Sequence, residues 1–111
     1  MASLTFFQKA IKLLSEGDVD AARQALWAIW NSGDSDAVQA AQFIAHIAEN
    51  ERRFNDAIHI LESSLEKLGK DAGTLAQLSE LYMTVGNLDK AIEAATLSID
   101  EAPHNAVTAL N

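Results

Sequence analysis

Apolar residues recur along stretches of the chain at spacings of three and four, which is the pattern of an α-helix with one apolar face. Three turn signals, Glu16-Gly17-Asp18, Arg52-Arg53 and Gly86-Asn87, each separate two such stretches. Gly17 and Gly86 can adopt the left-handed conformation that ends a helix. The pattern therefore predicts three helix hairpins, with helices at about 4–15, 19–31, 36–50, 54–68, 72–85 and 88–101 and the start of another from about 105.

The hairpins also repeat in sequence. Residues 54–65, FNDAIHILESSL, align with residues 88–99, LDKAIEAATLSI, at an offset of 34. Residues 19–30, VDAARQALWAIW, align with residues 54–65 at an offset of 35, so the first unit carries one extra residue, which we place in its exit loop NSGDSD. The repeats predicted in this way are about 4–37, 38–71 and 72–105, within a single domain over residues 1–111.

A helix hairpin repeated every 34 residues resembles the tetratricopeptide repeat, whose pattern is W-x2-L-G-x2-Y, then A-x3-F, then P. The third unit matches best, through Leu75, Leu78, Ser79, Tyr82, Ala91, Ala95 and Pro103. Small residues stand where the two helices of each hairpin would cross closely: Ala10, Ala45 and Ser79 in the first helices, and Ala22, Ala57 and Ala91 in the second.

The resemblance implies an all-α fold, namely a right-handed superhelical α-solenoid of three helix-turn-helix hairpins plus a short C-terminal helix that starts in residues 106–111. Either the chain is a fragment of a longer protein, or this last stub packs on the third hairpin as a cap. Lys9 occupies a slot that the family fills with an apolar residue. This departure indicates either an exposed N-terminal face or a first helix that is shifted in phase by one residue.

In the tetratricopeptide family the first helix of each hairpin lines a concave groove, and partner peptides usually lie there. The resemblance therefore implies a groove built from all three units. Its candidate residues are Leu4, Phe7, Ile11 and Leu14 in the first unit, Gln42, Phe43, His46, Glu49 and Asn50 in the second, and Gln77, Glu80, Met83 and Thr84 in the third.

The groove residues contain no lysine or arginine, which argues against the subset of the family that binds acidic C-terminal tails through charge-assisted donors. We expect an extended apolar or basic peptide, anchored by Phe7, Ile11, Phe43 and Met83. Glu49 and Glu80 would accept its cationic groups. Alternatively, Leu4, Phe7 and Ile11 cover the open end of the solenoid or pack on another copy of the chain.

The two tryptophans, Trp27 and Trp30, are three residues apart on one predicted helix, but the repeat alignment assigns them different roles. Trp30 aligns with Leu65 and Ile99 and is predicted to be a core residue. Trp27 aligns with two polar residues, Glu62 and Thr96, so we expect it partly exposed on the outer surface, where a large aromatic often marks an interface. The alternative is that the extra residue of the first unit turns Trp27 inward.

The charge balance of the chain excludes some classes of binding partner. There are 16 acidic and 8 basic side chains, for a formal charge of −8, and no stripe of lysine and arginine that could hold phosphates. Nucleic acid and anionic membranes are therefore not the expected partners. No stretch reaches the roughly 18 consecutive apolar residues of a membrane span, and the N-terminus lacks the pattern of a signal peptide, so we expect a cytoplasmic protein.

Catalytic and metal-binding motifs are missing from the sequence. It contains no Gly-x-Ser-x-Gly elbow, P-loop or His-Glu-x-x-His. His46 and Glu49 share a helix face, but a zinc site would need three or four convergent ligands. We therefore predict a non-enzyme without cofactor or metal.

The sequence favours a protein-protein interaction scaffold that binds an extended peptide or partner segment in the concave groove. Two alternatives stay open. The chain could be an oligomerisation or accessory module of a larger, enzymatic protein, and in that reading a homo-oligomer. It could also be an acidic bacterial secretion-type chaperone, a family that shelters apolar segments with about three such repeats.

Overall fold

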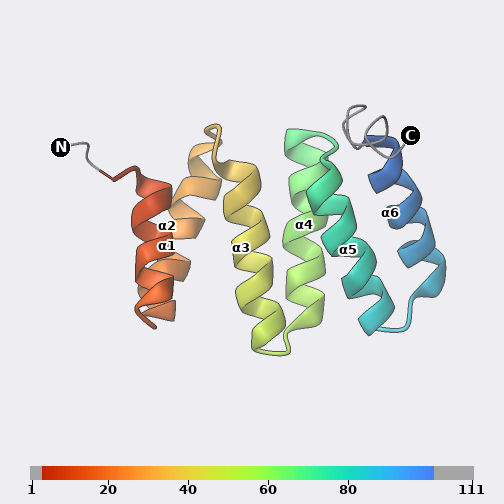
Figure 1. Cartoon of the computed structure of the whole chain (residues 1–111), viewed down its shortest axis with the longest axis horizontal. Coiled ribbons are helices and arrows are strands. Elements are labelled where there is room, and N and C mark those ends of the chain that lie inside the picture. The colour runs from red at the N-terminus through yellow and green to blue at the C-terminus, as the bar shows by residue number, and fades with distance from the viewer. Residues whose placement is uncertain (1–3, 102–111) are drawn as a thin grey trace, which may run out of the picture. The chain divides into compact units, whose positions relative to one another are not determined.

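A computed structural model describes residues 4–101, and this part of the chain is all-helical (Figure 1). Its helices are α1 Phe6–Ser15, α2 Val19–Ser32, α3 Ala37–Asn50, α4 Phe54–Leu68, α5 Ala72–Thr84 and α6 Leu88–Glu101. The all-α prediction is confirmed, and every expected helix in the described range is found within two residues of its expected ends. The further helix expected from about residue 105 lies outside the described residues, and the superhelical handedness stays a prediction.

The largest difference from an expected helix start is that of α1, which begins two residues later than predicted. Thr5 is its N-cap: the Gln8 N–H donates to Thr5 Oγ1 at 3.0 Å, and the Thr5 N–H donates to Gln8 Oε1 at 2.9 Å. This reciprocal capping box satisfies two backbone donors at the helix end and fixes the start at Phe6. Leu4 therefore precedes the helix and is 45% exposed.

The turns inside the three hairpins have the same geometry. In each turn a backbone N–H donates to the carbonyl five residues earlier: Asp18 to Leu13 (3.0 Å), Arg53 to Ala48 (2.8 Å) and Asn87 to Tyr82 (2.8 Å). This bond requires a left-handed residue just before the donor. Gly17 and Gly86 take that conformation, as their type predicts, and Arg52 adopts it with φ 62° although it has a side chain.

The chain divides into two compact units, residues 1–60 and 61–111, and the dividing point falls inside α4. In the first unit α1 packs on α2, and α2 packs on α3. Alanines at the crossing points let these helices approach closely. The buried apolar residues of the three helices are Ala10, Ala22, Leu26, Ile29, Trp30, Ala37, Ala40, Ala41, Ile44, Ala45, Ile47 and Ala48.

In the second unit α5 packs on α6. Ser79 Oγ donates to the Ala91 carbonyl at 2.8 Å, which places these two small residues at the crossing of the helices, where the sequence predicted them. Ser98 Oγ donates to the Ala72 carbonyl at 2.9 Å near the other end of the pair. The apolar core of the unit consists of Leu61, Leu75, Leu78, Leu81, Tyr82, Ala91 and Ala94.

Candidate functional site

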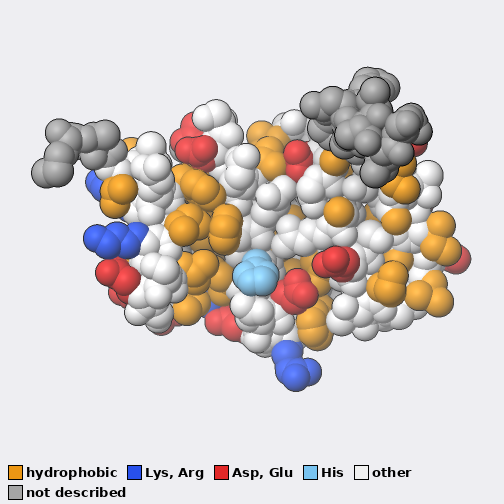
Figure 2. Space-filling view, viewed as in Figure 1, with side chains coloured by type: hydrophobic (Ala, Val, Ile, Leu, Met, Phe, Trp, Pro, Cys, Tyr) orange, Lys and Arg blue, Asp and Glu red, His pale blue; other side chains and the backbone are white. Residues whose placement is uncertain are grey.

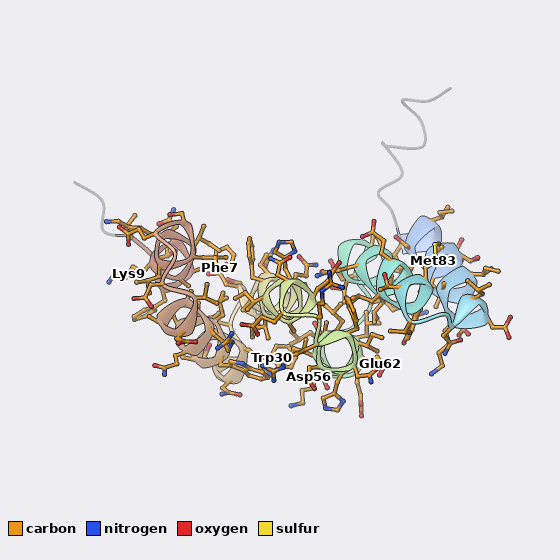
Figure 3. All side chains as sticks on the ribbon, turned by 90° about the horizontal axis from the view of Figure 1, so that it is seen from below. Phe7, Lys9, Trp30, Asp56, Glu62 and Met83 are labelled. Carbon is orange, nitrogen blue, oxygen red and sulfur yellow. The ribbon has the colours of Figure 1, made fainter. Side chains whose placement is uncertain are left out.

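An apolar surface of the first unit is built by α1 and α3. Phe7 and Phe43 meet edge to face, with ring centroids 5.7 Å apart and an interplanar angle of 65°. Ile11 and Leu14 follow Phe7 on the same face of α1, and all four side chains are only half-buried. Figure 2 shows hydrophobic side chains gathered between α1 and α3, and Figure 3 shows Phe7 pointing toward this side of α3. These four residues are called the α1–α3 surface below.

Polar residues of α3 extend this surface. Gln42 and Glu49 are half-buried, whereas His46 and Asn50 are exposed. The first unit therefore brings together the predicted groove residues of α1 and α3, and the only ionisable groups among them are one carboxylate and one imidazole.

The predicted groove residues of α5 lie in the second unit. Gln77, Glu80 and Met83 follow one another at a spacing of three, which keeps them on one side of the helix. Gln77 is half-buried, Glu80 is exposed, and Met83 is 60% exposed (Figure 3). Thr84 uses its hydroxyl locally, donating to the Glu80 carbonyl at 3.0 Å. This side of α5 combines one flexible apolar side chain with one carboxylate.

Trp27 and Trp30 differ in exposure, as the repeat alignment predicts. Trp30 is 8% exposed and belongs to the core, whereas Trp27 is 38% exposed. Trp27 borders a pocket that also involves Ile44, His59 and Ile60. The geometry makes Trp27 available at the surface, and its role as an interface residue stays a prediction.

Two arginines beside Trp27 are engaged in ion pairs. Arg23 bonds Asp20 at 2.9 Å and Glu51 at 2.6 Å, and Arg53 bonds Asp56 at 2.9 Å and lies 3.5 Å from Glu51. Both guanidinium groups already face carboxylates. The pocket therefore has little positive charge to offer an anionic ligand.

The structure also shows a pocket in the second unit that the sequence analysis did not identify. It has an apolar floor that includes Leu78 and Leu97. At its rim the Tyr82 hydroxyl donates to Glu62, and the Lys90 ammonium lies 5.7 Å from the centroid of the Tyr82 ring. The repeat motif marks Tyr82, but its partner comes from a helix twenty residues earlier, and no local pattern indicates that pairing.

Burial, followed by the hydrogen bond to Glu62 and the negative charges of Glu62 and Glu93, raises the pKa of Tyr82 above its ordinary value. The phenol is therefore a donor that stays protonated at neutral pH. Its contact with Glu62 joins α4 to α5 within the second unit.

Lys9 is exposed, so the departure from the family pattern reflects an exposed N-terminal face. Its ammonium lies 5.6 Å from the centroid of the Phe6 ring, and Figure 3 shows it on the side of α1 away from Phe7. Within residues 4–101, no group of three or more metal-ligating side chains comes together. None of the helices in this range is long and apolar enough to span a membrane.

Comparison with known proteins identifies the last hairpin. Residues 72–105 match the family model described as tetratricopeptide repeat. No curated protein matches the chain. Repeats of this type generally mediate protein-protein interaction and are typically non-catalytic. The match, together with the six helices found within residues 4–101, supports a tetratricopeptide-repeat-like family.

Proposed function

We propose that the chain is a cytoplasmic interaction scaffold that binds an extended apolar or basic segment of a partner protein, with the α1–α3 surface as its main contact. The observation that carries this proposal is the half-buried Phe7–Phe43 pair, beside Ile11 and Leu14. Half-buried aromatic side chains contribute strongly to binding free energy when a partner covers them, because they bury a large area at low cost in side-chain entropy.

The charge around this surface determines the expected ligand. Glu49 on α3 is a carboxylate beside these apolar residues, Glu80 lies beside Met83 on α5 of the second unit, and the predicted groove residues contain no lysine or arginine. A basic group on the partner would find a complementary acceptor, whereas an acidic peptide would be repelled by a chain of formal charge −8. In the second unit, Met83 gives α5 an exposed apolar side chain of its own that can adapt its shape to a partner.

The proposal is tested with two pools of labelled peptides that share apolar residues and differ in carrying lysine and arginine or aspartate and glutamate. Fluorescence anisotropy should show tighter binding of the basic pool, weakening as salt is added. Phe7→Ala and Phe43→Ala should each reduce affinity about tenfold or more, as expected for buried aromatic anchors. Equal binding of both pools would contradict the assigned charge preference.

A matched pair of histidine variants separates this surface from the outer one. His46→Glu changes an exposed residue beside the α1–α3 surface, and His59→Glu makes the same change at an exposed residue of the Trp27 pocket. We expect His46→Glu to alter peptide binding and His59→Glu to leave it unchanged, with both circular dichroism spectra like that of the wild type. The reverse result would move the interface to the Trp27 side.

A further inference from the structure

The outer face of α6 carries an apolar stripe. Leu88, Ile92 and Ile99 are 59%, 67% and 70% exposed, and their spacing of four and seven residues aligns them along one side of the helix. No part of the chain within residues 4–101 covers these side chains. A contiguous row of large exposed aliphatic residues is uncommon on a monomeric protein and typically marks a contact surface.

A second apolar surface lies on the first unit, on the side of α1 that carries Phe6 instead of Phe7. Phe6 is 77% exposed and borders a cavity of about 470 Å³. The apolar lining of this cavity is formed by α1 and α2, through Phe6, Leu13, Ala25, Ala28 and Ile29. The small side chains of Ala25 and Ala28 leave space between the helices that a partner's aliphatic side chain could fill.

The helices that carry the two apolar surfaces, α1 and α6, differ in the sign of their charged side chains. The helix α1 contains Lys9 and Lys12 and no acidic residue, and Lys9 borders the cavity. Asp34 is the carboxylate at its rim, and it already accepts hydrogen bonds from Ser32 Oγ (3.1 Å) and the Asp36 N–H (2.8 Å). The rim therefore has a cation on its α1 side and a hydrogen-bonded carboxylate at the end of α2.

On α6 the charges are mostly negative. The helix contains Asp89, Glu93, Asp100 and Glu101 against a single lysine, Lys90. By helical spacing, Asp89, Glu93 and Asp100 follow one flank of the apolar stripe. An aliphatic ridge with an acidic border therefore stands on α6, whereas the cavity between α1 and α2 has a basic border along α1.

We propose that the α6 stripe of one copy of this chain docks into the α1–α2 cavity of a second copy, in a head-to-tail contact. Two α6 stripes cannot pair equally well, because their acidic flanks would meet. The contact is heterologous, so each copy has one surface of each kind and assembly can continue beyond a dimer. It does not use the α1–α3 surface, and it stands or fails independently of the function proposed above.

Sedimentation velocity of the chain over micromolar to submillimolar concentrations tests this contact. The solution should contain about 0.15 M salt, which screens the long-range repulsion between copies of charge −8 to within about 8 Å. The average mass should rise with concentration and exceed that of a dimer. Phe6→Glu and Ile92→Glu should each abolish association, whereas Leu68→Glu, the same kind of change at another exposed apolar residue, should leave it intact.

Mixing the two blocked variants gives the decisive result. Phe6→Glu retains the α6 stripe and Ile92→Glu retains the cavity, so an equimolar mixture should form a dimer that does not grow further. Association that persists in Phe6→Glu alone would indicate an α6–α6 contact and overturn the proposal, as would a mixture that stays monomeric. A wild-type chain that is monomeric throughout would also overturn it, and that result is expected if residues after 101 of the same copy cover the stripe.

A pair of charge reversals provides a second route that does not alter the apolar residues. Lys9→Glu should weaken association at least several-fold, because it places a carboxylate against the acidic flank of α6. Adding Asp89→Lys and Glu93→Lys to the same chain should restore part of the loss, because every head-to-tail contact then joins the reversed charges. If Lys9→Glu associates as strongly as the wild type, the charges of α1 and α6 do not contribute to the contact. The proposal that a second copy of the chain occupies the cavity would then fail.

Discussion

At the scale of single residues, Tyr82 gives the most direct measurement, because it is the only tyrosine of the chain. Burial, and then its hydrogen bond to Glu62, raise its pKa in the folded state. The unfolded state, with a pKa of about 10, therefore loses the phenolic proton at lower pH than the folded state does. Stability should be unaffected by this group below about pH 10 and should fall as the pH rises further.

Ultraviolet titration of the phenolate should thus show a midpoint above the ordinary tyrosine value in the folded protein and a normal midpoint in urea. Glu62→Gln should lower the folded-state midpoint, because it removes a negative charge and weakens the acceptor. Glu93→Gln should lower it less, since Glu93 acts only through its charge. A folded-state midpoint that is the same in wild type and Glu62→Gln would show that the hydrogen bond does not persist in solution.

At the scale of the helix, the turn after α3 contains a residue in a strained backbone conformation that a glycine would relieve. Arg52 has φ 62° at the position where the other two hairpins have Gly17 and Gly86. A residue with a Cβ costs about 1–2 kcal/mol in this conformation, and glycine gives back only part of that through its greater entropy when unfolded. We expect Arg52→Gly to stabilise the protein by about 0.5–1 kcal/mol in urea unfolding.

The controls for this prediction use the same position and its counterpart. Arg52→Ala removes the charged side chain but retains the Cβ, so its stability should stay close to that of the wild type. Gly86→Ala introduces the strain where the chain avoids it, and should destabilise by about 1 kcal/mol. If Arg52→Ala stabilises as much as Arg52→Gly does, the side-chain charge and not the backbone conformation is responsible.

Helix ends and hairpin turns could be predicted from the sequence because their signals are local. Gly17 and Gly86 mark turns by their own backbone preference, and small residues such as Ser79 mark a crossing within their own hairpin. Exposure of the outer faces is different. Trp30 and Ile99 occupy aligned positions, yet they are 8% and 70% exposed, because burial there depends on which element packs against the helix. The Tyr82–Glu62 contact could not be predicted for the same reason.

At the scale of the whole molecule, α4 is the element that both compact units share. Residues 54–60 belong to the first unit and residues 61–68 to the second. If one unit unfolded alone, α4 would be cut to about two turns. Isolated helices shorter than about 12 residues are marginal in water, so this remaining segment would be poorly stable. Because α4 runs through both units, we therefore expect them to unfold together.

The aromatic residues allow each unit to be followed separately, because Trp27 and Trp30 lie in the first unit and Tyr82 lies in the second. Tryptophan fluorescence and the ¹⁹F signal of a fluorotyrosine at position 82 should give the same urea midpoint. Leu78→Ala removes a buried side chain of the second unit and should cost about 2–5 kcal/mol, lowering both midpoints equally. Leu26→Ala should do the same from the first unit. If Leu78→Ala lowers only the Tyr82 midpoint, α4 does not couple the two units, and each unfolds on its own.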